Sequence, residues 1–150
     1  MAYEIESPYV KIEVESAGRK AVLDADLSIE AVTEFGARCK RIMEDMDRLR
    51  PEIEEARKAL DLERMDALNS RAQAAVEGAC ASIVGDDGVR SFKEGCFPGR
   101  KQVLKPMLSL IEVLEAVVKG EGDARRKQEE LAAHYLSEAN SAQTEPDPAA

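Results

Sequence analysis

The segment 103–119, VLKPMLSLIEVLEAVVK, places the strongest constraint on how this chain folds. With helical spacing, its polar side chains gather on one narrow stripe and nearly all of the remaining surface is apolar. A surface helix has an apolar face of roughly 100° or somewhat more, so a wider face must be covered by other protein. Either the rest of this chain packs around the segment, or a second chain does.

The composition predicts one small helical domain with an aliphatic core. The chain has 150 residues, of which 44% are hydrophobic, and it contains no Trp, three Phe and three Tyr. Aliphatic cores of this kind are typical of helical bundles. The net charge of −9 argues against a nucleic-acid or anionic-membrane partner, since both carry dense negative charge. We therefore expect a protein partner, with a homo-oligomer as a further possibility.

The cysteines indicate a reducing compartment. Cys39, Cys80 and Cys96 are odd in number and widely spaced, without a CxxC pair, which fits buried thiols better than disulfides or a zinc site. The sequence shows no N-terminal signal pattern and no apolar run of about 18 residues. These features predict a cytoplasmic protein without a membrane partner.

The N-terminal region predicts a β-hairpin over 8–24. Val10, Ile12 and Val14 alternate with charged residues, and a turn at 16–18 leads into a return strand. An isolated hairpin is marginal in water, so this one is expected to pack on a helix or to pair with the edge of another chain.

A helical core is predicted over 28–119. Ser28 is the expected N-cap of the first helix. The first helix carries an apolar seam with coiled-coil spacing, made of Val32, Phe35, Cys39, Ile42, Met46 and Leu49. Pro51 is predicted to end this helix or to start the next one.

The helical pattern that follows Pro51 contains a slip near Asp61, which predicts a break, a kink or a change of packing partner. The glycine-acidic turn at 85–88 is expected to close this helix, and 89–100 to form an irregular link.

The C-terminal region is predicted to be more polar. Glycines 120 and 122 are expected to break the apolar helix, and a polar helix is expected over 123–137. The Ser/Pro/Glu/Ala-rich segment 138–150 is predicted to be disordered. The expected organisation is thus mainly α: a single domain over 1–137, with an N-terminal β-hairpin followed by a helical bundle, and a disordered C-terminal tail.

The sequence predicts no catalytic, cofactor-binding or metal-binding residues, and we expect a protein that is not an enzyme. His134 is the single histidine, and the three cysteines lie on or near apolar stripes. The DxDxxxE spacing of Asp24, Asp26 and Glu30 permits a cation site in principle, but it lacks the other ligands of an EF-hand loop. Helix capping is the simpler interpretation.

Three segments, taken in order, resemble the small tail-assembly chaperones of long-tailed (siphovirus-type) bacteriophages or prophages. They are the hairpin leading into an acidic helix, the apolar helix end ACASIVGDDG at 79–88, and the phenylalanine-containing link at 92–97 before the apolar helix. The chain departs from this family at Val84, because such proteins tend to have phenylalanine before the glycine.

The resemblance implies a non-enzymatic role in virion assembly in the host cytoplasm. Such chaperones coat the long tape-measure protein and help to recruit tail-tube subunits. On this model the partner-binding ridge of the apolar helix is formed by Leu104, Leu108, Ile111, Leu114 and Val118. Alternatively, the same ridge belongs to the core of the monomer. A different interpretation of the whole chain is a self-associating helical scaffold or adaptor without a chaperone role, joined through the seam in 32–49.

Overall fold

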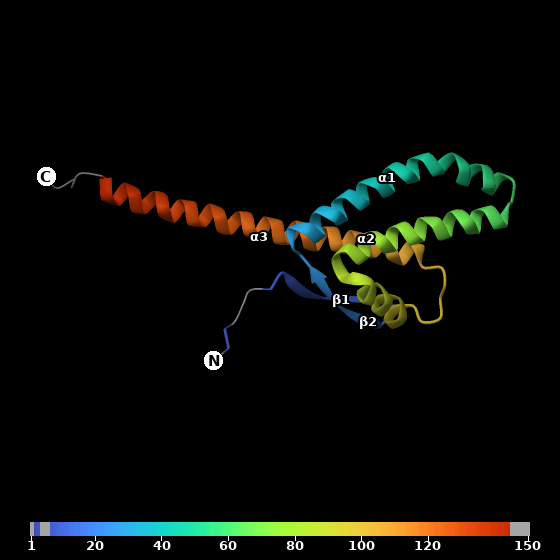
Figure 1. The fold of residues 1–150 in the computed structure, drawn as a ribbon, viewed down its shortest axis with the longest axis horizontal. Coiled ribbons are helices and arrows are strands. Elements are labelled where there is room, and N and C mark those ends of the chain that lie inside the picture. Colours follow the sequence, from blue (N-terminus) through green and yellow to red (C-terminus); the bar gives the residue numbers. More distant parts are fainter. Residues whose placement is uncertain (1, 4–6, 145–150) are drawn as a thin grey trace. The chain divides into compact units, whose positions relative to one another are not determined.

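The computed structural model describes residues 2, 3 and 7–144, without the side chains of 121–129 and 137–144. In chain order the elements are β1 (Tyr9–Ser16), β2 (Arg19–Asp26), α1 (Ile29–Lys58), α2 (Leu62–Cys96) and α3 (Leu104–Thr144) (Figure 1). This mainly helical arrangement with an N-terminal β-hairpin confirms the predicted fold class. The chain divides into two compact units, residues 1–115 and 116–150, with the boundary inside α3. The single domain over 1–137 stays a prediction.

The hairpin is antiparallel, with Ser16 opposite Arg19 at the turn and Tyr9 opposite Asp26 at the far end. Ala17 and Gly18, the two turn residues, have φ values of 51° and 80°. Positive φ at both central positions is the geometry of a type I′ turn, which matches the twist of the two strands. The hairpin predicted from alternation is therefore present, and its second strand extends two residues further than expected.

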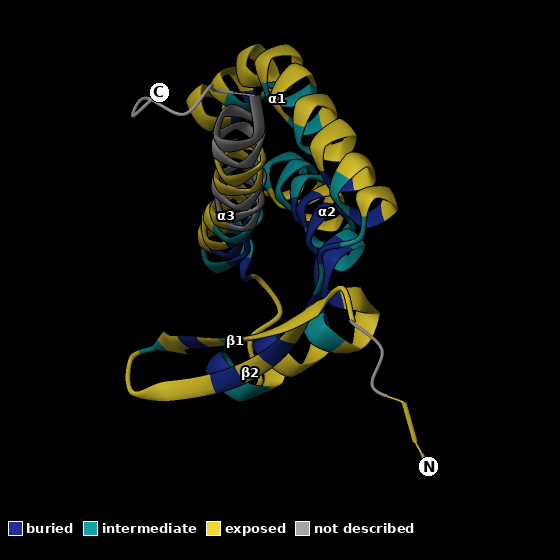
Figure 2. Ribbon diagram, turned by 90° about the vertical axis from the view of Figure 1, so that its left-hand side faces the viewer, coloured by how far each residue is buried: buried dark blue, intermediate teal, exposed yellow. Residues whose placement is uncertain are grey.

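The hairpin packs on α2 through β2. Ala21, Leu23 and Ala25 on the inner face of β2 are buried (Figure 2). The C-terminal end of α2 comes so close that a Cβ at Gly95 would lie 3.3 Å from the carbonyl oxygen of Lys20. The hairpin was expected to pack on a helix or to pair with the edge of another chain. This contact confirms the first expectation, because a helix of the same chain covers β2.

Helix α1 begins as predicted and ends later than predicted. The Ser28 hydroxyl accepts a hydrogen bond from the Ala31 N–H at 3.3 Å, which confirms Ser28 as the N-cap. Pro51 lies inside α1, so the prediction that it ends or starts a helix was wrong. Helix α1 runs through Pro51 without ending there. Because proline has no backbone N–H, this costs the helix one backbone hydrogen bond.

The connection between α1 and α2 lies at the predicted pattern slip. Leu60 has a φ of 51°, and the Asp61 N–H donates to the Ala56 carbonyl at 3.0 Å. This is the hydrogen bond of a Schellman motif, with Leu60 at the position that usually holds glycine. The Asp61 side chain then caps α2 by accepting from the Arg64 N–H.

Helix α2 consists of two segments that meet at Gly85. This residue has φ 74° and ψ 168°, which interrupts the helix for a single position. The predicted glycine stop is therefore correct for the first segment. The predicted irregular link at 89–100 was wrong for 89–96, because a second helical segment starts directly after Gly85 and runs to Cys96. Two aspartates in the first turn of that segment favour its start.

Helix α3 is continuous where a break was predicted. It passes through Gly120 and Gly122 and ends at Thr144, beyond the predicted start of the tail at 138. A glycine costs a helix only about 1 kcal/mol relative to alanine, so good helix formers on both sides can carry the helix across it. Residues 145–150, the rest of the predicted tail, lie outside the described residues.

Candidate protein-binding groove

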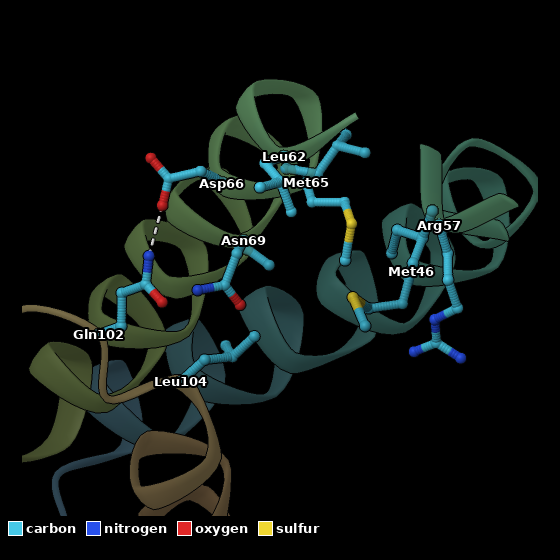
Figure 3. A pocket seen from close by; sticks show the side chains of 11 residues that line it. Met46, Arg57, Leu62, Met65, Asp66, Asn69, Gln102 and Leu104 are labelled. Atoms are coloured by element: carbon cyan, nitrogen blue, oxygen red, sulfur yellow. Dashed lines mark hydrogen bonds between the residues drawn. The ribbon is translucent and has the colours of Figure 1, made fainter. Parts of the chain in front are cut away.

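A groove opens between α1 and α2 at the end where the two helices are joined (Figure 3). It has a volume of about 430 Å³, within the range of ligand-binding clefts. Eleven residues line it: Met46, Ile53, Arg57, Leu62, Met65, Asp66, Leu68, Asn69, Ala72, Gln102 and Leu104. The floor and walls are mainly apolar, and the polar groups are few.

The groove lies along the part of α1 between two closely packed positions, Phe35 and Ala56, which are 3% and 0% exposed. Among the six seam residues Phe35 is buried, and the other five, Val32 included, are half-buried. Pro51 interrupts the backbone hydrogen bonding of α1, and proline is a common cause of helix bending. Figure 1 shows the middle of α1 bowed away from α2, with the last turns of α1 descending again toward the connection to α2. The apolar seam therefore faces a partly open space.

The buried Gln73 side chain positions the link between α2 and α3, which forms a third side of the groove beside α1 and α2. Its Nε2 donates to the Lys101 carbonyl at 3.1 Å, and its Oε1 accepts from the Val103 N–H at 2.9 Å. Gln102, between these two residues, donates to the Asp66 carboxylate at the rim. These bonds hold the link to α2 and place Leu104, the first residue of α3, at the groove.

The lining suits an apolar helix better than a polar ligand. Met46 and Met65 extend into the space from opposite helices (Figure 3). Methionine is unbranched and polarisable, so it adapts its shape to a partner surface. Grooves of this kind bind amphipathic helices through their apolar face. A small polar substrate would need several convergent polar groups, and Asp66 and Gln102 already bond to each other.

The predicted partner-binding residues fall into different environments. Leu104 is half-buried and lines the groove. Leu108 is also half-buried, whereas Ile111 and Leu114 are 8% and 0% exposed and belong to the core of the first unit. Val118 is half-buried in the second unit. Partner binding at this ridge remains a prediction, but the buried positions of Ile111 and Leu114 favour the core interpretation for these two residues.

The three cysteines are free thiols with raised pKa values. Burial raises the pKa of Cys80 to about 12, and the neighbouring Cys39 and Glu77 add to the effect. Burial also raises the pKa of Cys39, with a further contribution from Glu115. Burial raises the pKa of Cys96 against the opposing effects of the Ser16 backbone and Arg19. Because the thiolate is the nucleophile, none of these thiols is activated at neutral pH.

The acidic motif at the start of α1 has a structural role, and His134 lies on the exposed surface of α3. Asp26 accepts a hydrogen bond from the Ser28 N–H at 3.0 Å, which supports the capping interpretation of the acidic motif. His134 is exposed, with its ring centroid 6.4 Å from that of Tyr135. Within the described residues, no group of three or more His, Cys, Asp and Glu side chains is arranged to hold a metal ion. No helix in this part of the chain is both long and apolar enough to cross a membrane.

The polar rim of the groove was missing from the sequence-based predictions. Met46, Ile53, Met65 and Leu68 stand out as apolar helix positions, but Asp66 and Gln102 meet only in the folded chain. The available signal was the cluster of apolar residues around the turn at 59–61. Comparison with protein-family models, with curated proteins and with solved structures finds no match for this chain.

Proposed function

We propose that this protein is a non-enzymatic assembly chaperone that binds an amphipathic helix of a partner protein in the α1–α2 groove. The observation that carries this proposal is the groove itself, an open, methionine-containing apolar space within a chain that otherwise buries an aliphatic core. Covering such a groove with a partner helix removes apolar surface from water on both sides.

The resemblance noted in the sequence supports a specific class of partner. A tape-measure protein of a phage tail is long and helical, and its apolar helix faces need shielding before assembly. Recruitment of tail-tube subunits would be the second part of this role. The raised pKa values of the thiols also favour a binding function over thiol-based catalysis.

The test is co-expression with the longest helical protein encoded beside this gene, followed by affinity capture and measurement of the dissociation constant. The informative variants are Leu62→Glu and Met46→Glu. Leu62 lines the groove yet is 73% exposed, so a charge there should disturb binding and leave folding intact. We expect binding to weaken about tenfold or more, as for the loss of an interface anchor.

Met43→Glu is the matched control. Met43 lies on the same helix as Met46 but outside the groove, and it is 71% exposed. It should bind like the wild type. Equal affinity of all three variants, each shown to be folded by circular dichroism, would rule out the groove as the binding site. Absence of any complex with a helical partner would contradict the chaperone proposal itself.

A further inference from the structure

Strand β1 has an unpaired edge. The sheet has two strands, and β2 is the neighbour of β1 on one side. On the other side, no strand of the described chain pairs with it. An exposed edge presents unpaired backbone donors and acceptors to another strand.

The backbone groups that face this edge can be assigned from the register. The Leu27 N–H donates to the Pro8 carbonyl at 3.0 Å, so the pair formed by residues 8 and 27 is hydrogen-bonded. In an antiparallel ladder hydrogen-bonded pairs alternate along the strands. Residues 10, 12, 14 and 16 therefore bond to β2, and the N–H and C=O groups of residues 9, 11, 13 and 15 point to the open side.

The inner face of β1 also lacks part of its cover. Its neighbours Ala25 and Leu23 in β2 are 0% and 1% exposed, whereas Val10 is 39% exposed and Ile12 is half-buried. A second groove, of about 610 Å³, opens beside β1. Its apolar lining residues are Val14, Phe92, Phe97, Pro106, Leu110 and Val113. An added strand would continue this apolar face.

We propose that β1 pairs with β1 of a second copy of this chain, antiparallel and centred on Ile12, to form a four-stranded sheet across a two-fold axis. In this register the outward-facing backbone groups of Lys11 meet those of Glu13 in the second copy. This contact occurs twice by symmetry. On the inner face, Ile12 meets its own equivalent and Val10 meets Val14.

Charge selects this register over its neighbours. Centring the pair on Lys11 would place two lysines opposite each other, and centring it on Glu13 would place two glutamates opposite each other. Like charges directly across a strand pair are destabilising, whereas opposite charges are favourable. Within one chain Lys11 already lies opposite Asp24, and the charged groups of Glu13 and Lys20 lie 3.3 Å apart. The added pairs would extend a row of alternating charges.

This self-association is independent of the α1–α2 groove, and its test is charge exchange in the full chain. Sedimentation velocity should show a concentration-dependent dimer for the wild type. Lys11→Glu and Glu13→Lys each place like charges across the interface and should weaken the dimer about tenfold or more. The double variant restores opposite charges between chains and should recover the dimer.

The double variant separates pairing between chains from stability of the hairpin. Within one chain it places a carboxylate at position 11 opposite Asp24 and an ammonium group at position 13 near Lys20. A purely intramolecular effect would therefore make the double variant the weakest of the three. A mixture of the two single variants should also form a heterodimer, detected with one chain labelled with ¹⁵N. A monomeric wild type, unchanged dimers in both single variants, or a double variant without recovery would overturn the proposal.

Amide hydrogen exchange on the wild type gives a second test that needs no variant. The amides of residues 12 and 14 should be protected at every concentration, because they bond to β2. Those of residues 11 and 13 should become protected only as the dimer forms. Equal exchange of residues 11 and 13 in dilute and concentrated protein would place the interface elsewhere.

Discussion

The buried Cys80 thiol makes the stability of the folded chain depend on pH. It is 0% exposed, and its thiol lies 3.8 Å from the Met107 carbonyl oxygen, to which it donates a weak hydrogen bond. Burial in this apolar setting is the main reason that its pKa rises to about 12 from an ordinary value of 9.0. The folded chain therefore holds this proton more tightly than the unfolded chain does.

We predict that the protein loses stability above about pH 9. The contribution of Cys80 is complete below the unfolded pKa and is lost as pH rises through the folded pKa. Between the two pKa values the unfolded chain binds fewer protons, so the free energy of unfolding falls by up to about 1.4 kcal/mol per pH unit. Urea unfolding from pH 7 to pH 11 measures this slope.

Cys80→Ala is the comparison for this pH effect. The variant is expected to be less stable at pH 7, because it leaves a small cavity, but to lose less stability above pH 9. Groups that do not interact with Cys80 titrate in the same range and affect both proteins alike, whereas the titration of the neighbouring Cys39 is coupled to Cys80. Parallel profiles for the two proteins would show that Cys80 ionises normally.

At the scale of the element, Gly85 determines the path of α2. Its φ of 74° and ψ of 168° lie in a region that is almost exclusive to glycine. Gly85→Ala should therefore cost about 1–3 kcal/mol of stability, although an added Cβ would meet no atom within 4 Å. The loss would come from the backbone alone. Chemical denaturation of the two proteins measures it.

Gly36→Ala is the matched control for Gly85. Gly36 lies in the interior of α1, it is exposed, and a Cβ there also meets nothing within 4 Å. Because alanine is the better helix former, this change should stabilise the protein by about 0.5–1 kcal/mol. A Cβ fits at both glycines, yet the expected changes in stability have opposite signs. The comparison therefore isolates the effect of backbone conformation. A neutral result at Gly85 would mean that the kink can straighten.

The elements differ in how well the sequence predicts them. Local chemistry determines the hairpin, the Ser28 cap and the turn near Asp61, and all three are present. The second segment of α2 is not predicted because a glycine that follows a helical pattern usually marks the end of the helix. Val89, Phe92 and Cys96 have helical spacing and are all buried, so the signal was in the sequence.

The candidate groove was much less predictable. Its apolar residues can be read from the helical periodicity, but its existence depends on how α1 and α2 diverge in space. Gln73 forms hydrogen bonds with the backbone of Lys101 and Val103, about 30 positions away along the chain. No local sequence pattern predicts these bonds. Tertiary contacts of this kind decide which apolar residues are buried and which remain available.

On the scale of the whole molecule, the core of the first unit joins residues from β2, α2 and α3. Leu23, Ile83, Met107 and Leu114 are among its most buried side chains. We predict that Leu114→Ala destabilises the protein by about 2–5 kcal/mol, since the truncation leaves a cavity. The urea midpoint, with its slope checked for two-state behaviour, measures this loss.

Leu108→Ala distinguishes the core from a binding ridge on the same helix. Leu108 is half-buried, so its truncation removes less buried surface and should cost clearly less stability than that of Leu114. Weaker partner binding in Leu108→Ala, at nearly unchanged stability, would support the predicted ridge. Equal losses of stability in both variants would instead place Leu108 in the core.

The interruption at Gly85 has a mechanical consequence. The helical segment beyond it, which ends at Cys96 beside the hairpin, acts as a lever about 16 Å long. A rotation of about 10° at Gly85 would carry its far end by about 3 Å. An ion pair joins the two segments across the interruption, with the charged groups of Lys93 and Glu77 lying 2.6 Å apart. This ion pair opposes the rotation. The direction in which the edge of β1 faces therefore depends on the backbone at Gly85, together with this ion pair and the buried contacts between the segment and β2.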